Sequence, residues 1–195
     1  MKRLYFILVL WIGKFGNVLC KIFHKSGTMI SGKVAVKLQK NFVKYFRNID
    51  YDKVIFITGT NGKSTTTNLV SHTVKMAGKE VATNTEGANM MSGVATTLIK
   101  NSSLFGKFNK EFLILEIDER SLRNIFKVLP AKNLCITNLQ KDQVQRNGDP
   151  DFIYQMFKGA VNKDVTLFVN NEEPRSRSLE DYVGKVVYYS MEKNS

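Results

Sequence analysis

Cysteine, histidine, proline and tryptophan are scarce in this chain of 195 residues, which contains two, two, three and one of them, respectively. Cys20 and Cys135 lie far apart, without Cys-x-x-Cys or Cys/His spacing, so neither a disulfide framework nor a zinc site is encoded. A reducing, cytoplasmic compartment is therefore expected. His24 and His72 have no catalytic partner nearby in the sequence, and both are expected to serve in packing or at the surface.

Long hydrophobic runs are also missing. Residues 4–12 are apolar and follow two basic residues, as in a signal peptide, but no small-residue cleavage site comes after them. Glycines, lysines and Asn17 interrupt the run well short of the ~20 apolar residues that a spanning helix needs, so no transmembrane helix is expected. Two alternatives stay open for this basic amphipathic segment: it lies on an anionic membrane surface, or it docks as a helix on the rest of the protein.

The balance of charge is strongly positive, because 29 Lys and Arg stand against 17 Asp and Glu for a formal net charge of +12. Nucleic acid, acidic phospholipid and nucleotide phosphates would all match this charge. The basic residues occur as singles and pairs, which favours diffuse solubilising charge over nucleic-acid binding, and no nucleic-acid partner is expected. With 43% hydrophobic residues the chain can bury a core, which excludes disorder as its main state.

Two regions of the chain differ in their pattern. Residues 1–48 are predicted to form an N-terminal helical segment, broken at Gly27 and Gly32. From residue 49 to residue 195, short β-rich apolar runs alternate with helical stretches, as in βαβ units. The expected strands are 54–57, 80–83, 112–117, 134–137, 165–169 and 186–189, and the expected helices are 64–76 and 121–128. This pattern predicts an α/β fold with a mostly parallel, doubly wound sheet.

One segment between a strand and a helix carries the chemistry: Ile57 to Thr66, with the sequence ITGTNGKSTT. Backbone N–H groups of such a glycine-bearing turn face phosphate oxygens, and the helix N-terminus adds a favourable dipole. Lys63 is expected to supply a cation to the β and γ phosphates, and Ser64 a hydroxyl to Mg²⁺. A plain turn before a helix is the structural alternative. The predicted cofactor-binding residues of this P-loop are Gly59, Thr60, Asn61, Gly62, Lys63, Ser64 and Thr65.

The loop departs from the general form G-x-x-x-x-G-K-[ST], because Ile57 takes the place of the first glycine and Gly59 is extra. In this form it resembles the nucleotide loop of the Mur ligase family. These ATP-dependent amide-forming enzymes include folylpolyglutamate synthases and the peptidoglycan stem-peptide ligases. Segments 84–90, 115–119 and 137–143 are similar to the MurT-like branch of the family, in the same order and at similar spacing, and the resemblance runs through nearly all of the chain.

Carboxylates after the strand at 112–117 are candidate metal ligands. Glu116 lies at the carboxyl end of that strand, where an open α/β sheet places its ligand crevice, and it can hold Mg²⁺ beside Ser64. The resemblance gives the matching Glu this metal role, and Lys63 and Glu116 are the predicted catalytic residues. Asp118 and Glu119 are either further metal contacts or helix-start carboxylates stabilised by the dipole.

Asn138 follows another expected strand, so Asn138, Asp142 and Gln143 are expected to reach the same crevice, with Asn138 as a cofactor contact. Related ligases often carry His where this chain has Gln143, whereas MurT-like sequences carry Gln. The branch usually has the segment D-Q-x-D-R-[YF]-G-E. This chain departs from it, with Gln145 in place of the acidic residue and Asn147 in place of the aromatic residue.

Residues 84–93 are rich in small and amide residues, which allow close approach of the backbone to a ligand. An ordinary surface loop is equally compatible with this composition. The resemblance favours a loop over the triphosphate or the acceptor, with Asn89 as a cofactor contact.

The resemblance implies a reaction as well as a fold. ATP and Mg²⁺ are the expected cofactors, and the D-glutamate α-carboxylate of lipid II would be amidated to D-isoglutamine through an acyl phosphate. A glutaminase subunit similar to GatD would deliver ammonia from glutamine. The expected location is cytoplasmic, at the inner face of the membrane where the lipid II substrate lies.

Members of this branch continue well beyond 195 residues, with a four-cysteine zinc ribbon and a C-terminal domain that supplies a catalytic acid. Residues 49–195 are therefore expected to be a central ATP-binding domain that stops before the ribbon. Two alternatives stay open. One is another Mur-type amide ligase, acting on a stem peptide or a folate; the other is a catalytically inactive nucleotide-binding module, which the departures at Gln145 and Asn147 favour.

Overall fold

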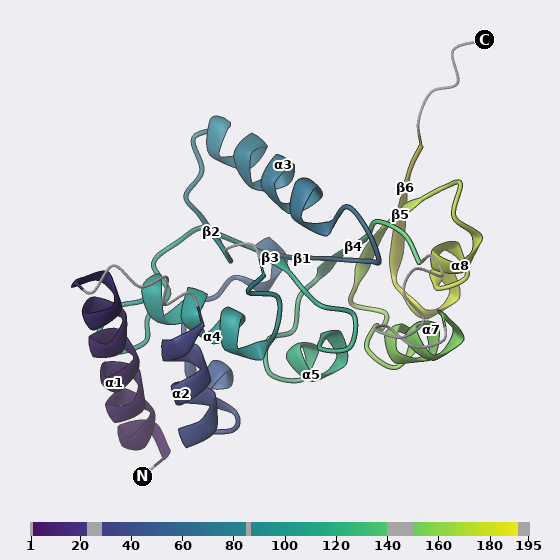
Figure 1. Ribbon diagram of the computed structural model, residues 1–195. Coiled ribbons are helices and arrows are strands. Elements are labelled where there is room, and N and C mark those ends of the chain that lie inside the picture. Colours follow the sequence, from purple (N-terminus) through teal and green to yellow (C-terminus); the bar gives the residue numbers. More distant parts are fainter. Residues whose placement is uncertain (1, 23–28, 85–86, 140–149, 191–195) are drawn as a thin grey trace.

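A parallel sheet with helices on both faces forms the centre of the molecule. The computed structural model describes residues 2–22, 29–84, 87–139 and 150–190. Figure 1 shows helix α3 (Lys63–Met76) on one face of the sheet, and α5 (Leu122–Phe126) and α7 (Pro150–Lys158) on the other. Helices α1 (Lys2–Ile22) and α2 (Ile30–Leu38) lie side by side at one end of the molecule.

Six strands make up this sheet, in the order β2-β3-β1-β4-β5-β6, and every neighbouring pair is parallel. They are β1 (Val54–Thr58), β2 (Val81–Thr83), β3 (Phe112–Glu116), β4 (Asn133–Ile136), β5 (Thr166–Asn170) and β6 (Lys185–Tyr189). All six agree with the predicted strands to within one residue at each end. The central strands are apolar on both faces because helices cover both, and such runs are recognisable in sequence. The predicted α/β class is confirmed.

The strand order reverses at β1, which predicts a ligand-binding position at the carboxyl ends of β1 and β3; we call this position the crevice. Strand β1 lies between β3 and β4, so the chain leaves β3 and crosses over β1 to form β4 on the other side. An open α/β sheet binds ligands outside the strand ends at such a reversal. The register pairs Ile57 with Glu116, which brings the loop after β1 beside the last residue of β3.

Both predicted helices of the sheet domain are present, α3 at 63–76 and α5 at 122–126. Helix α4 (Met91–Lys100) was not predicted, and the loop expected over residues 84–93 is therefore wrong in its last three residues. The segment 93–99 within α4 is buried throughout, which explains its small and apolar composition. The remaining short elements are α8 (Pro174–Arg177) and the 3₁₀ turns at Phe42–Tyr45, Tyr51–Lys53 and Glu180–Tyr182.

Helix α2 corrects a second expectation, because the break predicted at Gly32 does not occur. A Cβ at this position would lie 1.9 Å from the carbonyl oxygen of Ser92, so α2 and α4 approach too closely for a side chain. The Gly32 N–H also donates to Thr96 Oγ1 at 3.0 Å. This glycine permits close helix packing and does not end the helix. The other predicted break, Gly27, lies outside the described residues.

One face of α1 is docked on the rest of the protein. The ring of Phe6 lies 5.1 Å from that of Phe42 and 5.2 Å from that of Phe46. The Lys14 ammonium donates to the carbonyl oxygens of Ile99 at 2.7 Å and Ser102 at 2.6 Å. By length and composition alone α1 also qualifies as a membrane span, with 28% of its most apolar stretch buried, so the absence of a transmembrane helix stays a prediction.

Candidate functional site

The loop after β1 has a backbone that only glycine fits at one position. Gly59 has φ = +132° and Gly62 has φ = +80°. A Cβ at Gly59 would lie 2.2 Å from Thr137 Oγ1 and 2.8 Å from the carbonyl oxygen of Asn138. The Thr60 N–H donates to the same carbonyl at 3.0 Å. The loop is therefore pressed against the residues that follow β4.

Asn138 holds the tip of the loop through its side chain. The Asn61 N–H donates to Asn138 Oδ1 at 3.0 Å, and Asn138 Nδ2 donates back to the Asn61 carbonyl at 3.1 Å. The Thr137 hydroxyl donates to that carbonyl as well, at 2.6 Å. Asn138 thus reaches the crevice as predicted, and what it contacts there is the loop itself. Its direct contact with a cofactor stays a prediction.

The N-terminus of α3 is suited to an anion. The helix begins at Lys63 after Gly62, and neither a capping side chain nor an acidic residue occupies its first turn. Asn61, Gly62 and Thr65 are exposed. The first N–H groups of a helix lack intrahelical partners and carry the positive end of its dipole, which favours phosphate. The structure therefore places the predicted loop residues where a phosphate group would meet them.

Three of the predicted site residues meet at the end of β3. Ser64 Oγ donates to Glu116 Oε2 at 2.7 Å, and Asn89 Nδ2 donates to Glu116 Oε1 at 3.1 Å. Glu116 is only 5% exposed. Each oxygen of this buried carboxylate therefore has one hydrogen-bond donor, from α3 on one side and from the segment before α4 on the other.

Asn84 fixes the backbone of Glu116, a role that the sequence did not single out. Its side-chain amide donates to the carbonyl oxygens of Glu116 and Ala88, both at 2.8 Å, and its Oδ1 accepts from the Glu116 N–H at 2.9 Å. Asn84 directly follows β2, and β2 pairs with β3. The sequence did offer one signal for this role, because Asn84 is an amide residue placed directly after an expected strand.

Lys63 is paired with Glu119 and with the loop carbonyls. Its ammonium lies 3.2 Å from Glu119 Oε1, donates to the Thr60 carbonyl at 3.1 Å, and donates also to the Gly59 carbonyl. The side chains of Lys63 and Glu119 are 15% and 5% exposed. Burial raises the pKa of the Glu119 carboxyl, against the opposing effect of the nearby ammonium. The lysine of the loop thus has a buried anionic partner.

The two carboxylates after β3 have different surroundings. Asp118 shapes the turn before α5: its Oδ1 accepts from the Arg120 N–H at 3.0 Å, and its carbonyl accepts from the N–H groups of Ser121 and Leu122. Glu119 points instead to the loop lysine. Both residues precede the first residue of α5, so neither belongs to the first turn of that helix.

The donor set at the end of β3 fits Mg²⁺. A serine hydroxyl and a carboxylate are the hard oxygen ligands that this ion prefers, and it usually keeps several waters and binds phosphate oxygens in addition. In the part of the chain that the structure describes, no group of three or more His, Cys, Asp and Glu residues gathers as a metal site. Ser64 and Glu116 are therefore the residues that could hold the ion together with a nucleotide.

Several residues singled out in the sequence lie outside the described residues. They are His24, Asp142 and Gln143, the departures at Gln145 and Asn147, and Glu86 of the segment after β2. The expected places of Asp142 and Gln143 in the crevice stay predictions, as does the packing or surface role expected for His24.

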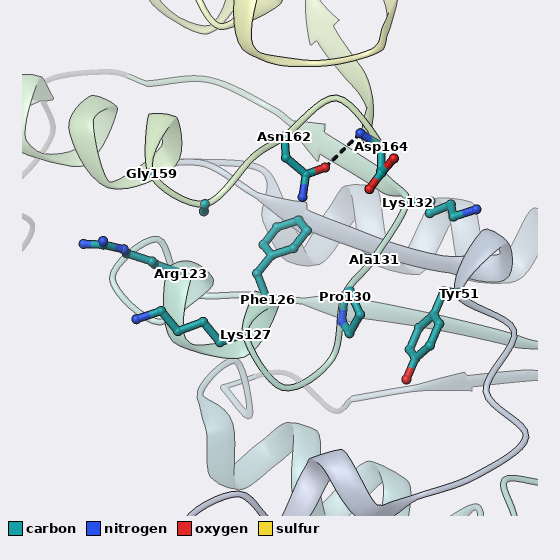
Figure 2. Close-up of a pocket in the computed structure, with 11 residues that line it drawn as sticks. Tyr51, Arg123, Phe126, Lys127, Pro130, Ala131, Lys132, Gly159, Asn162 and Asp164 are labelled. Atoms are coloured by element: carbon teal, nitrogen blue, oxygen red, sulfur yellow. Dashed lines mark hydrogen bonds between the residues drawn. The ribbon is translucent and has the colours of Figure 1, made fainter.

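A cavity of about 430 Å³ lies at the opposite edge of the sheet, near the amino ends of β1, β4 and β5. Figure 2 shows the Phe126 ring at its centre, below Asn162, with Arg123 and Lys127 on one side and Lys132 on the other. The residues predicted for the site do not line it. The two edges of the sheet are therefore distinct, and the predicted chemistry belongs to the carboxyl edge.

Comparison with known proteins identifies close relatives of the sequence. The model of the Mur ligase middle domain matches residues 57–195. The MurT subunit of lipid II isoglutaminyl synthase (glutamine-hydrolyzing) from Staphylococcus aureus (strain COL) is 30% identical over 185 residues, which are 94% of this chain and 41% of that protein. The MurT subunit from Streptococcus pneumoniae (strain ATCC BAA-255 / R6) is 35% identical over 150 residues, 76% of this chain and 33% of that protein. The chain thus spans about two fifths or less of the length of these relatives.

Solved structures have the same fold at low sequence identity. MurF ligase from Thermotoga maritima, in complex with ADP, superposes with a TM-score of 0.62 at 17% identity, covering 82% of this chain and 36% of that one. MurF from Acinetobacter baumannii gives a TM-score of 0.60 at 14% identity, covering 83% of this chain and 35% of that one. At this level of identity the likeness shows the fold alone.

Proposed function

The chain belongs to the Mur ligase family, and we propose on this basis that it is the ATP-binding part of a ligase of peptidoglycan synthesis. The observation that carries the proposal is the meeting of Lys63, Ser64 and Glu116 at the carboxyl ends of β1 and β3. More narrowly, the reaction is amidation of the D-glutamate α-carboxylate of lipid II to D-isoglutamine, through an acyl phosphate. The names of the two MurT relatives support this narrower assignment.

Ser64 and Glu116 hold the metal in this proposal. Mg²⁺ bound there would neutralise charge on the phosphate oxygens. Asn89 donates to one oxygen of the Glu116 carboxylate and Asn84 fixes its backbone, so the carboxylate is oriented before a nucleotide arrives. Such supporting hydrogen bonds keep a ligand in its working orientation.

Lys63 changes partners when phosphate binds. Its ammonium gives up the carbonyls of Gly59 and Thr60 and the Glu119 carboxylate, and donates to phosphate oxygens, where it stabilises charge that develops during phosphoryl transfer. Glu119 then loses its cation. Burial already raises the pKa of this carboxyl, and loss of the nearby cation would raise that pKa further.

Further components complete the proposed enzyme. The relatives are named glutamine-hydrolyzing, and we assign ammonia delivery here to a glutaminase subunit similar to GatD. The lipid-linked acceptor places the enzyme in the cytoplasm, at the inner face of the membrane. Because the chain spans 41% or less of the two MurT relatives, the remaining parts of a complete ligase are not represented in it.

Titration calorimetry of the chain with Mg·ATP tests the proposal. We expect saturable binding by the natural sequence and about 10- to 100-fold weaker binding by Lys63→Ala, because hydrogen bonds to charged groups are worth about 1.5–3 kcal/mol. Lys75→Ala is the matched control, since this exposed lysine lies in the last turn of the same helix.

Two outcomes would count against the proposal. Absence of saturable binding by a chain with a cooperative thermal transition would overturn the nucleotide site. Binding that is intact, with no ATP turnover once the remaining ligase domains, glutaminase and lipid II are supplied, would overturn the assigned reaction and favour an inactive nucleotide-binding module.

A further inference from the structure

The positive charge of this protein is concentrated at one end of the sequence. Residues 1–49 contain ten Lys and Arg and no Asp or Glu; the first acidic residue is Asp50. The other 146 residues hold 19 basic and 17 acidic residues, so ten of the twelve net charges come from the first quarter of the chain. The charge is therefore regional, and the region is the one that contains α1 and α2.

Helix α1 has a second apolar face, opposite the one that is docked. On the inner face, Phe6, Val9 and Leu10 are at most 1% exposed. The outer face recurs at helical spacing and is open to solvent, with every member at least 46% exposed. We call it the α1 outer surface, and its main residues are Leu4, Leu8, Trp11, Ile12, Phe15 and Val18. A helix that buries one apolar stripe ordinarily has a polar opposite face.

Neighbouring segments extend the α1 outer surface. Trp11 Nε1 donates to the Leu104 carbonyl at 2.9 Å, and the Tyr5 hydroxyl donates to the Leu38 carbonyl at 3.0 Å. The polar atoms of both aromatic side chains are thus satisfied by backbone. Leu104 and Phe105 are each 58% exposed beside Trp11. A contiguous apolar patch of this kind marks an interaction site.

We propose that the α1 outer surface binds the surface of an anionic lipid bilayer, with the helix lying in the plane of the interface. Charge complementarity selects this occupant, because residues 1–49, the part of the sequence that contains α1, include ten basic residues and no acidic residue. An amphipathic helix binds membranes through its buried apolar area together with attraction to acidic headgroups. Figure 1 shows α1 at the outer edge of the molecule, beyond α2 and α4, where a flat surface can reach it.

The docked face keeps α1 in the plane of the bilayer. To cross the membrane, the helix would have to withdraw Phe6 from Phe42 and Phe46 and Lys14 from the carbonyls of Ile99 and Ser102. These contacts tie α1 to the turn at Phe42–Tyr45 and to the end of α4. Membrane binding by the α1 outer surface does not depend on the nucleotide site, although it agrees with a lipid-linked acceptor.

The full chain and two kinds of vesicle provide the test. Trp11 is the only tryptophan of the sequence and lies on the proposed surface. With vesicles of phosphatidylglycerol and phosphatidylcholine we expect co-flotation, a blue shift of the Trp11 emission, and loss of binding as salt is raised. With phosphatidylcholine alone we expect much weaker binding.

A matched pair of variants identifies the surface. Phe15→Glu introduces a charge at a 65% exposed position of α1, and Leu69→Glu does the same at a 66% exposed position of α3. We expect Phe15→Glu to weaken vesicle binding by about tenfold or more, because it removes apolar area and adds repulsion, and Leu69→Glu to leave it unchanged. Circular dichroism of both variants checks that they fold.

Three results would overturn the inference. The first is no flotation and no emission shift with the anionic vesicles. The second is equal vesicle binding by folded Phe15→Glu and the natural sequence. The third is a dimer in lipid-free solution that Phe15→Glu dissociates and that does not bind vesicles, which would assign the surface to a second copy of the chain.

Discussion

The crevice at the carboxyl ends of β1 and β3 and the α1 outer surface are opposite in construction. In the crevice, buried and half-buried polar groups are tied to one another by short hydrogen bonds, such as Ser64 to Glu116 at 2.7 Å. On α1, large apolar side chains such as Phe15 are exposed, within a part of the sequence, residues 1–49, that has basic but no acidic residues. In the proposed function the crevice exchanges a few directed contacts for those of a small ligand, whereas the α1 outer surface offers area and charge.

This difference determines how each region responds to substitution. A directed contact depends on position to within a fraction of an ångström, so a single added atom can abolish it. An apolar surface sums many small contributions, so single changes act in proportion to the area that they remove. The following substitutions separate the two regions, beginning with the largest expected effect.

Gly59→Ala should break the crevice and leave the α1 outer surface intact. The added Cβ would lie 2.2 Å from Thr137 Oγ1 at a φ that alanine rarely adopts. We expect a loss of about 3 kcal/mol in the free energy of unfolding, measured by urea denaturation, together with loss of Mg·ATP binding. Gly78→Ala is the control, with φ = +76° and no atom within 4 Å of the new Cβ, and about 1 kcal/mol is expected there.

A crossed experiment tests whether the two regions are independent. Lys63→Ala should lose about 10- to 100-fold in nucleotide affinity and bind anionic vesicles normally, whereas Phe15→Glu should show the reverse. Calorimetry and vesicle flotation on both variants give four measurements. Loss of both nucleotide binding and vesicle binding in either folded variant would show that the two regions are coupled.

Glu119→Gln tests the effect of burial in the crevice through the pH dependence of the free energy of unfolding. Because burial raises the folded-state pKa of Glu119, the folded state binds its proton more tightly than the unfolded chain does. The stability from this group is full below the unfolded pKa of about 4.3 and falls as pH rises through the folded pKa. Urea denaturation at a series of pH values from about 4 upward measures the free energy of unfolding. As pH rises, this free energy should fall in the natural sequence through a step that Glu119→Gln lacks.

Glu111 supplies a control of opposite sign. Hydrogen bonding to Lys53 lowers the pKa of this carboxyl, so its contribution is present above the unfolded pKa and is lost as pH falls. Glu111→Gln should therefore remove stability mainly at neutral pH. If both glutamine variants changed the pH profile of the free energy of unfolding in the same direction, burial would not be what governs the pKa of Glu119.

Gly16→Ala has the smallest expected effect and probes α1. A Cβ at this position meets no atom within 4 Å, and the glycine lies in the interior of a helix. We expect a gain of about 0.5–1 kcal/mol in the free energy of unfolding, since alanine loses less conformational freedom than glycine. Thermal unfolding measures it, and vesicle binding should not change. A loss of stability would indicate that the α1 backbone needs glycine there.

The strands were predictable, and the packing of glycines was not. Buried apolar runs such as Val54–Thr58 are legible because both faces of a central parallel strand are covered. Gly32 was expected to break a helix, since local propensity does not register the carbonyl of Ser92 on the neighbouring helix. Helix α4 was missed because its small residues resemble a loop until the helices around it are known.

The site was predictable by residue type more readily than by contact. The pairing of Ser64 with Glu116 followed from the loop motif, the family resemblance and the position of Glu116 at the carboxyl end of a predicted strand. The pairing of Lys63 with Glu119, and the grip of Asn84 on Glu116, required knowing that β3 lies between β1 and β2. The clustering of charge before Asp50 was visible in the sequence, but counting over the whole chain made the charge look diffuse.

The central position of β1 also determines when this strand can pair during synthesis of the chain. Val54 pairs with Leu113, and Ile55 pairs with Asn133, 59 and 78 positions further along the chain. At about 5–20 residues per second, a growing chain needs on the order of ten seconds after making β1 before β4 exists to hold it. During that interval the loop after β1 lacks its contacts with Thr137 and Asn138, so the proposed binding of ATP would stabilise the fold only near the end of synthesis of this region.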